Sequence, residues 1–246
     1  MSRDPKKTIL VLGATSAVAH AYLRLAAREE WFATYVLVAR NAGNLELVHQ
    51  DIAARSGLAV ISIVADLSDV TSGSTLMDQV LAATDKIDEC LLAYGLLESN
   101  SVEAVLETNL VSAAIWLEAL AAHFERQAHG QLVAIGSVAG DRGRQSNYVY
   151  GASKAGLERI CEGLSHRFTD HDHIHFCCLK PGFIETPMTA HLDRSGWLWS
   201  RPDQIAKRIR RAVQKQRARV YAPWWWRYIM LGVRLLPMPL FHKSKL

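Results

Sequence analysis

TILVLGATSAVA, residues 8–19, has the pattern of a buried strand followed by a turn and the start of a helix. Its first five residues show no polar alternation, which is typical of a parallel strand covered on both faces. Gly13 permits a tight turn, and the backbone N–H groups of the helix that follows could face a pyrophosphate. A glycine after a strand is more often an ordinary turn, so this stretch alone predicts the local fold and leaves its use open.

Apolar runs of strand length and segments of helical periodicity alternate along the rest of the chain. Further strands are expected at 34–39, 58–65, 87–94, 131–136, 174–179 and 219–221, with helices between them, for example at 17–28, 102–127 and 148–168. This order predicts an α/β, single-domain Rossmann fold: a doubly wound, seven-stranded parallel sheet flanked by helices, with ligands at the carboxyl ends of the strands. We expect a catalytic domain over residues 1–222 and a short extension over residues 223–246.

The composition is that of an ordinary globular protein. The 246 residues are 50% hydrophobic and 21% charged, which is enough to form one core and argues against disorder. None of the four cysteines forms a CxxC pair, and three of them fall in expected strands, so a disulfide framework is not expected. The polar start MSRDPKK lacks the apolar region of a signal peptide. We therefore expect a cytoplasmic protein.

The charges are distributed unevenly. No Asp or Glu follows Asp203, while eleven Lys and Arg residues do, which leaves 17 basic against 24 acidic residues before that point. Residues 224–236 (WWWRYIMLGVRLL) predict a short basic and aromatic helix that ends before Pro237. At 1.5 Å per residue it is about 20 Å long, too short to span a bilayer. The basic charge favours an anionic partner, and peripheral contact with the inner membrane face is preferred to nucleic acid. Alternatively, the helix is a packing element that closes a pocket or forms an oligomer interface.

Four strand ends carry residues suited to a nicotinamide dinucleotide. Arg40 ends the second strand, where it could pair with a 2′-phosphate and favour NADP(H), with NAD(H) as the alternative, or be a solvated surface arginine. Asp66-Leu67 ends the third strand, where the carboxylate could face adenine or cap the next turn. The expected cofactor contacts up to the fourth strand are Gly13, Thr15, Ser16, Ala17, Val18, Arg40, Asp66, Leu67, Ala93, Tyr94 and Gly95.

The strongest chemical signal lies between the fifth strand and the helix after it. Tyr150 and Lys154 are four positions apart, so on a helix they share a face, and Ser137 follows the fifth strand. An ammonium beside a phenol favours the phenolate, which should lower the pKa of Tyr150 toward the range of a working proton donor. The Ser137 hydroxyl could bond the same substrate oxygen. A Tyr-x-x-x-Lys pair alone is common, and the serine thirteen residues earlier raises its significance.

With these residues the chain resembles the short-chain dehydrogenase/reductase family from Thr8 to about Met188. The matching residues are the Gly13 turn, Asp66-Leu67, Ala93-x-Gly95, Asn109, Ser137, Tyr150-x-x-x-Lys154 and Pro181-Gly182-x-x-x-Thr186. The resemblance implies an NAD(P)(H)-dependent oxidoreductase in which Tyr150 transfers the proton, Lys154 holds the nicotinamide ribose and Ser137 positions the carbonyl. It also implies that Asn109 organises a water-linked proton path. Pro181 and Gly182 would border the nicotinamide, together with Ile184 and Thr186.

The sequence departs from the family pattern at the cofactor end. Two glycines of the usual fingerprint are replaced by Ala17 and Ala19, and the customary Asn-Asn-Ala-Gly is Leu92-Ala93-Tyr94-Gly95. Each added methyl group or ring should crowd the phosphate and ribose path. These changes favour, as an alternative of another class, a catalytically weak cofactor-sensing or scaffold protein, which the intact catalytic set opposes.

A narrower resemblance extends into the C-terminal tail. The runs AYGLL, PGFIETPMTAHL and VYAPWWWRYIMLGVRLLPMPLF are similar to the decaprenylphosphoryl-2-keto-erythro-pentose reductases. This implies a ketone substrate, in that group a keto-sugar linked to a polyprenyl phosphate. Candidate substrate residues are Arg142 and Arg144, which could bind a phosphate or be solvated, and Met188 and His191, which could form a lid or only pack. We expect a homo-oligomer and no nucleic acid partner. We also expect no metal, because the histidines in HDHIHF lack a third ligand at suitable spacing.

Overall fold

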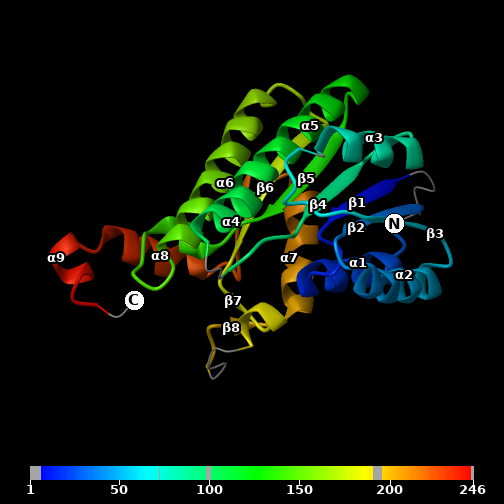
Figure 1. Cartoon of the computed structure of the whole chain (residues 1–246). Helices are drawn as coiled ribbons and strands as arrows, with labels where there is room; N and C mark the ends of the chain where they lie inside the picture. Colours follow the sequence, from blue (N-terminus) through cyan, green and yellow to red (C-terminus); the bar gives the residue numbers. More distant parts are fainter. Residues whose placement is uncertain (1–6, 72, 98–100, 191–195, 245–246) are drawn as a thin grey trace.

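The structure is a computed structural model that describes residues 7–71, 73–97, 101–190 and 196–244. Seven parallel strands form one sheet in the order β3-β2-β1-β4-β5-β6-β9, and Figure 1 labels all of them except β9. They are β1 (Thr8–Leu12), β2 (Thr34–Ala39), β3 (Ala59–Val64), β4 (Glu89–Leu92), β5 (Gly130–Ile135), β6 (Ile174–Pro181) and β9 (Arg219–Ala222). The predicted doubly wound, seven-stranded parallel sheet is confirmed.

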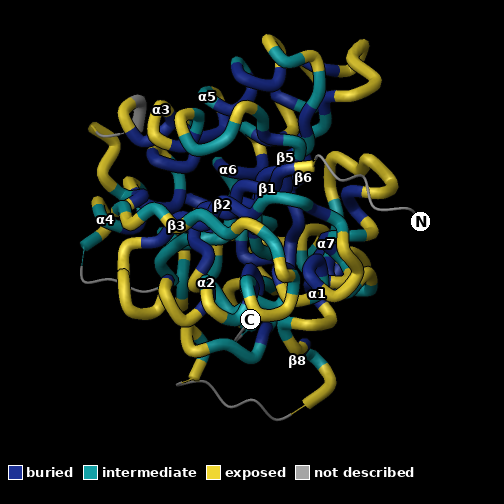
Figure 2. Tube along the Cα trace, turned by 90° about the vertical axis from the view of Figure 1, so that its right-hand side faces the viewer, coloured by how far each residue is buried: buried dark blue, intermediate teal, exposed yellow. Residues whose placement is uncertain are grey.

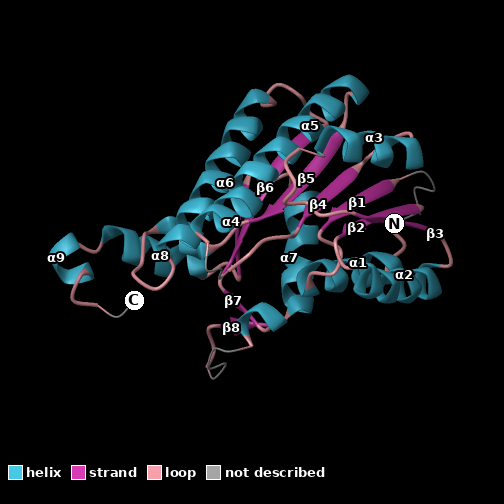
Figure 3. Cartoon of the chain, viewed as in Figure 1, coloured by secondary structure: helices cyan, strands magenta, loops and turns pink. Residues whose placement is uncertain are grey.

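Helices cover both faces of the sheet and enclose two apolar cores (Figure 3). One face is covered by α1 (Ala17–Arg28), α2 (Ala42–Ser56) and α7 (Pro202–Gln214). The other is covered by α3 (Gly73–Ala83), α5 (Ser112–Gln127) and α6 (Tyr148–Arg167). The strand order reverses direction between β1 and β4, and the carboxyl ends of these strands are where ligands bind in such sheets. The residues that directly follow β1, β2, β4 and β5 lie at this edge.

Residues of the central strands are more buried than those of the edge strand β3, because helices cover the middle of the sheet on both faces (Figure 2). All five residues of β1 are buried, because helices lie above and below it. The edge strand β3 is only partly covered, and Ala59, Ser62 and Val64 differ in exposure from their neighbours along it. The continuous apolar pattern therefore predicted β3 as a strand correctly while overstating its burial.

The expected helix over 102–127 is divided. It consists of α4 (Val102–Leu106), one π-helical turn η1 (Glu107–Val111) that holds Asn109, and α5. By length and composition Val102–Gln127 could cross a membrane, but half of its most apolar window is buried inside the fold. Trp116, Leu120 and Phe124 lie in the core between α5 and the sheet. Val102–Gln127 is therefore a helical segment of the core, and the π turn that holds Asn109 interrupts it near its N-terminal end.

The segment after β6 forms structure that the sequence pattern did not predict. β7 (Phe183–Ile184) and β8 (Trp199–Ser200) pair as a small second sheet, and a 3-10 turn, η3 (Pro187–Thr189), lies between them. Strands of two residues are too short to produce a periodic signal. The tail contains α8 (Trp226–Leu235) and α9 (Met238–Phe241) and projects from the end of the molecule opposite the N-terminus (Figure 1). Its helix begins two residues later than predicted and ends before Pro237, as expected.

Candidate active site

Ser137, Tyr150 and Lys154 come together at the carboxyl edge of the sheet. Ser137 lies between the end of β5 and a 3-10 turn, η2 (Val138–Asp141), and its Oγ accepts a hydrogen bond from the Ala139 N–H at 3.1 Å. Tyr150 stands in the first turn of α6, and its phenol and the Ser137 side chain share a hydrogen bond. Lys154 follows one turn later on the same face. The structure therefore brings the three predicted catalytic side chains to one place.

Lys154 is buried and held from two sides. Its Nζ donates a hydrogen bond to the Ile135 carbonyl at 3.0 Å and lies 5.9 Å from the centroid of the Tyr150 ring. Burial lowers the pKa of Lys154 to about 8, because the ammonium loses hydration. The side chain can still be charged near neutral pH, within reach of a group bound beside the phenol.

The pKa of Tyr150 departs from the expectation drawn from the Tyr-x-x-x-Lys spacing. The sequence predicts that Lys154 lowers this pKa, whereas in the structure burial raises the pKa of Tyr150. The hydrogen bond with Ser137 and the nearby charge of Arg144 lower it, but by less than desolvation raises it. The prediction of a lowered pKa is wrong for this structure, because the phenolate would lose more solvation than these two groups return.

Asn109 is fixed by the backbone of the loop after β4. Its side-chain oxygen accepts from the Leu96 N–H at 2.7 Å, and its Nδ2 donates to the Leu96 carbonyl at 2.7 Å and to Ser153 Oγ at 3.2 Å. A Cβ at Gly95 would lie 2.8 Å from Asn109 Oδ1 and 3.3 Å from Lys154 Nζ. Only glycine leaves room here. Asn109 therefore joins the β4 loop to α6, and its part in a proton path stays a prediction.

The turn after β1 fits the close approach of a dinucleotide. Gly13 has φ +87°, and a Cβ there would lie 2.7 Å from the Tyr94 backbone nitrogen. α1 begins shortly after the carboxyl end of β1, and the Ser16 side chain does not cap it, so the first N–H groups of this helix have no side-chain acceptor from Ser16. Thr15 is exposed, Ala17 is half-buried and Val18 is buried. The residues at this edge thus fit a pyrophosphate, with the helix N-terminus and the glycine turn as its cradle.

The ring of Tyr94, which was expected to crowd the ribose path, packs against the core. Its hydroxyl and Ser112 Oγ lie 2.8 Å apart, and Ser112 in turn donates to the Leu67 carbonyl. The aromatic ring packs against the core under α5, and burial raises the pKa of Tyr94. Tyr94, which stands where the family has a small residue, therefore presents its backbone, together with that of Ala93, to the carboxyl edge of the sheet.

Arg40 and Asp66 lie at the adenosine end. Arg40 is exposed at the end of β2, and its charge helps to lower the pKa of Asp66. Asp66 accepts hydrogen bonds from the Ser68 N–H at 2.9 Å and from the Ser68 hydroxyl at 2.6 Å, and these bonds are the main cause of its lowered pKa. Of the two roles weighed for Asp66, the turn cap is present in the structure.

Trp226 of the tail lies against the segment expected to border the nicotinamide. A Cβ at Gly182 would fall 1.9 Å from the Trp226 ring nitrogen, so glycine at this position makes room for the indole. Pro181 and Ile184 are buried beside it. Thr186 caps η3 through bonds with Thr189. Met188 is 46% exposed, and His191 lies outside the described residues.

The two arginines between Ser137 and Tyr150 have different surroundings. Arg142 Nη1 donates to the carbonyls of Val233, Arg234 and Leu236 at the end of α8, and its guanidinium lies 4.0 Å from the centroid of the Phe241 ring. Arg142 therefore caps the tail helix, a role that differs from both a phosphate ligand and a solvated loop charge. A substrate role for Arg142 stays a prediction. Arg144 has a buried Nε without a hydrogen-bond partner in the described part of the chain, and its charge acts on the Tyr150 phenol.

A buried ionic cluster under η2 was missed by sequence reasoning. The Lys180 ammonium contacts the carboxylates of Asp141 and Glu158, the Tyr221 hydroxyl donates to Asp141 at 3.0 Å, and Arg219 lies 2.8 Å from Glu158. These residues are far apart in sequence, and nothing in their spacing indicates a contact. The cluster anchors the turn that carries Ser137. Loss of one partner would leave a buried charge uncompensated.

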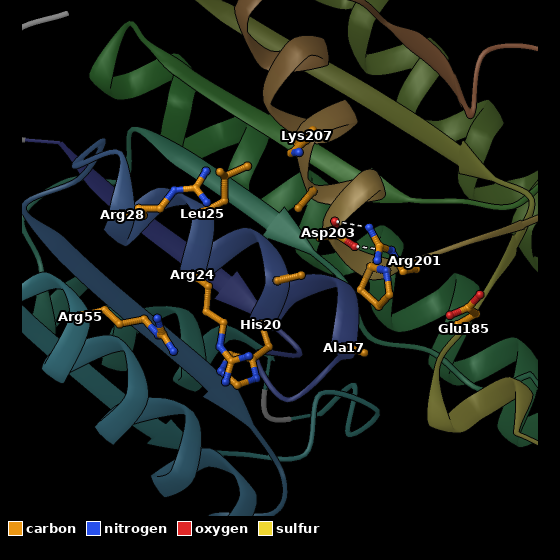
Figure 4. A pocket seen from close by; sticks show the side chains of 13 residues that line it. Ala17, His20, Arg24, Leu25, Arg28, Arg55, Glu185, Arg201, Asp203 and Lys207 are labelled. Carbon is orange, nitrogen blue, oxygen red and sulfur yellow. Dashed lines mark hydrogen bonds and ion pairs between the residues drawn. The ribbon is translucent and has the colours of Figure 1, made fainter.

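A groove of about 670 Å³ lies between α1 and the start of α7, lined by Ala17, Arg24, Arg55, Arg201 and Lys207 among others (Figure 4). Its cations are largely paired: Arg24 and Arg55 contact Asp51 at 2.7 and 2.8 Å, and Arg201 contacts Asp203 at 3.4 Å. None of the predicted catalytic residues lines it. The groove borders the helix N-terminus at Ala17 and adds no catalytic group to the site.

Comparison with known proteins agrees with this geometry. The model of the family described as short chain dehydrogenase matches residues 7–196. An uncharacterized oxidoreductase of Streptomyces coelicolor is 32% identical over 97% of this chain and 96% of its own. One from Mycobacterium tuberculosis is 32% identical over 83% of this chain and 85% of its own.

Solved structures share the fold at lower identity. A short-chain dehydrogenase from Sphingobium yanoikuyae in complex with NADPH has a TM-score of 0.80 at 22% identity, over 93% of each chain. The bulky-bulky ketone specific alcohol dehydrogenase from Comamonas testosteroni has a TM-score of 0.78 at 18% identity, over 94% of this chain and 95% of its own. With the family match and the two relatives, these findings show that the chain is an oxidoreductase of the short-chain dehydrogenase/reductase family.

Proposed function

We propose that this protein reduces a ketone with hydride from NADP(H), with Tyr150 as the proton donor. The observation that carries the proposal is the meeting of Ser137, Tyr150 and Lys154 beside Gly95, whose missing side chain leaves room next to the Lys154 ammonium. When bound there, the nicotinamide supplies the hydride. The Ser137 hydroxyl hydrogen-bonds the carbonyl oxygen, and the Tyr150 hydroxyl gives its proton to that oxygen as the C=O bond becomes an alcohol.

The protonation states favour the direction of reduction. The raised pKa keeps the Tyr150 phenol protonated at neutral pH, as a proton donor requires. Lys154, with a pKa of about 8, is mostly charged at that pH and stabilises the phenolate left after proton transfer. Oxidation of an alcohol would instead need the phenolate first, which burial opposes.

The preference for NADP(H) over NAD(H) rests on Arg40. Its exposed guanidinium stands at the end of β2, where a carboxylate would suit an unphosphorylated ribose. An arginine can bind a 2′-phosphate through two parallel hydrogen bonds. Among the described residues no hydrogen bond or ion pair holds the Arg40 guanidinium, and Asp66, whose pKa its charge lowers, is bonded by Ser68, so the donors of Arg40 are available for the phosphate.

The substrate that the site fits best carries an anionic group. Arg144 acts on Tyr150 by its charge, and its buried Nε has no partner among the described residues. An unpaired, half-buried guanidinium would gain hydrogen bonds from a phosphate or carboxylate near the ketone. A lipid-linked carbonyl compound, such as a polyprenyl-phosphate keto-sugar, meets this requirement. The tail beside Ser137 exposes apolar side chains, which supports a position at the inner membrane face. We further propose that the protein lies on the cytoplasmic side, forms a homo-oligomer and has no nucleic acid partner.

The test is an assay of a panel of ketones with NADPH and with NADH. The reaction is monitored through the loss of absorbance of the reduced nicotinamide. The panel should include neutral ketones, their phosphorylated counterparts and polyprenyl-phosphate keto-sugars. We expect turnover with NADPH and faster turnover of the anionic members. Tight NADPH binding without turnover of any member would favour the alternative, a cofactor-sensing or scaffold protein, which Ala17 and Ala19 at the fingerprint positions favour.

A further inference from the structure

The tail exposes a row of large apolar side chains on one side. Trp224 is 58% exposed, Tyr228 61%, Leu231 51% and Leu235 72%. Their spacing of four, three and four positions places them on one face of α8 and the turn before it. Met238, 57% exposed, and Leu240, 56% exposed, follow in α9, and Trp197, 72% exposed, makes a tilted ring contact with Trp225 at a centroid distance of 5.0 Å. We name this set, Trp197, Trp224, Tyr228, Leu231, Leu235, Met238 and Leu240, the outer tail face.

The opposite side of α8 is already used for packing. Trp226 and Met230 are buried with Val138, and Val233 packs against them. Gly182 accommodates the Trp226 ring, and Arg142 holds the last carbonyls of the helix. The outer tail face is therefore apolar surface left over after the tail has been seated on the fold. Contiguous apolar surface of this kind marks an interaction site in most proteins.

The charges around the outer tail face decide its partner. Arg227, Arg234 and Lys243 are exposed among the apolar residues, and the chain contains no Asp or Glu after Asp203. A second copy docked by the same face would bring like charges together without a compensating carboxylate. Anionic lipid headgroups complement the cations, and Trp and Tyr favour the interface between headgroups and acyl chains.

We propose that the outer tail face docks this protein on an anionic lipid bilayer, with α8 lying in the plane of the interface. α8 has ten residues, about 15 Å of helix, so it rests on the membrane without crossing it. Because the inner side of α8 contacts Val138, next to Ser137, docking would hold the catalytic edge close to the bilayer. This last consequence rests on the proposed reductase function, whereas docking itself does not.

The experiment is co-sedimentation of the full chain with vesicles of phosphatidylcholine alone or mixed with phosphatidylglycerol. The test variant is Leu235→Glu in the outer tail face. The matched control is Leu47→Glu, because Leu47 is also an exposed leucine, at 66%, but lies on α2. We expect the unchanged protein and Leu47→Glu to bind the phosphatidylglycerol vesicles, with binding weakened by salt, and Leu235→Glu to bind at least about tenfold more weakly.

Other outcomes overturn the proposal. Equal recovery of all proteins in the supernatant would refute docking, as would equal binding of Leu235→Glu and the unchanged protein. If light scattering shows that Leu235→Glu turns a larger assembly into a smaller one while no protein binds vesicles, the face is an interface between copies. Reduction of a water-soluble ketone should be the same for both variants. Absence of that activity in every protein, including the unchanged one, would refute the proposed function. The conclusion from vesicle binding would not be affected.

Discussion

Lys154 and Tyr150 show how environment sets chemistry at the level of single residues. Both groups are expected from sequence at four-residue spacing, and both lie where predicted. Their pKa values depend on burial, which spacing does not report: burial lowers that of Lys154 to about 8 and raises that of Tyr150. In a more exposed site the pKa values of the same phenol and ammonium would lie closer to their ordinary values of 10.0 and 10.5.

The pKa of Lys154 predicts the pH dependence of the reaction. For the free enzyme, Lys154 is charged below about pH 8 and neutral above it. Since the reaction needs the ammonium to stabilise the developing phenolate, kcat/KM for reduction should fall as pH rises through about 8. Steady-state rates across this range check it. A profile that stays flat up to 10.5, the ordinary value for lysine, would contradict the assignment.

Arg40 gives a prediction about cofactor choice. Arg40→Asp should weaken NADPH binding by about 10²-fold or more, since it replaces a charge-assisted pair with repulsion, and should change NADH binding far less. Fluorescence titration of each nucleotide measures both constants. The exposed Arg55 lies outside the strand ends, so Arg55→Asp serves as the control for a general change of charge. An unchanged ratio of the two affinities in Arg40→Asp would remove the 2′-phosphate role.

At the scale of elements, the site depends on how α8 and η2 are held. The sequence predicted a C-terminal helix and left open whether it packs on the protein or faces a membrane. The structure shows that its inner side packs on Val138 and Gly182. No local pattern could have revealed this contact, because Trp226 and Gly182 are 44 positions apart. The π turn at Asn109 was missed for a similar reason: it is stabilised by the distant Leu96 and Ser153.

The packing of α8 predicts a stability difference between neighbouring tryptophans. Trp226 is 5% exposed and Trp224 is 58% exposed. Trp226→Ala should lower the free energy of unfolding by about 3 kcal/mol, because it leaves a cavity beside Gly182, whereas Trp224→Ala should change it by less than about 1 kcal/mol. Urea unfolding followed by circular dichroism measures both. Equal effects would mean that the tail is not seated as described.

At the scale of the whole molecule, the doubly wound parallel sheet and the helical layers on its two faces were predictable from the sequence. Seven apolar runs alternate with amphipathic segments, and parallel sheets built this way are covered on both faces. The buried cluster of Lys180, Asp141 and Glu158 was not predictable, since charged residues give no periodic signal and their pairing depends on tertiary contacts. The positions of Ser137, Tyr150 and Lys154 were predictable because Ser137 follows β5, and Tyr150 and Lys154 lie one turn apart in the first part of α6.

One buried carboxyl links the sheet to two helices of one layer and should make the stability of the molecule depend on pH. Glu89 of β4 accepts from the Tyr22 hydroxyl of α1, lies 3.9 Å from Arg210 of α7, and also faces Lys7 and Asp88. Burial raises the pKa of Glu89 to about 7 from 4.5. A raised carboxyl pKa gives stability that is present below about pH 4.5 and lost as pH rises through about 7.

Glu89→Gln removes this titration. The unfolding free energy of the unchanged protein, relative to that of Glu89→Gln, should fall by on the order of 3 kcal/mol between acidic and mildly basic pH. Denaturant unfolding of both proteins at several pH values measures the difference. A difference that does not vary with pH would show that the pKa of Glu89 is the same in the folded and the unfolded protein, and would contradict the raised pKa.

The central claim is that the Tyr150 hydroxyl gives the proton in a hydride-transfer reaction. Tyr150→Phe keeps the ring on α6 and removes only the hydroxyl, so the direct measurement is NADPH oxidation with an active ketone beside NADPH binding by titration. The account predicts a loss of kcat of about 10²- to 10⁴-fold with nearly unchanged binding of NADPH. Turnover close to that of the unchanged protein would contradict it.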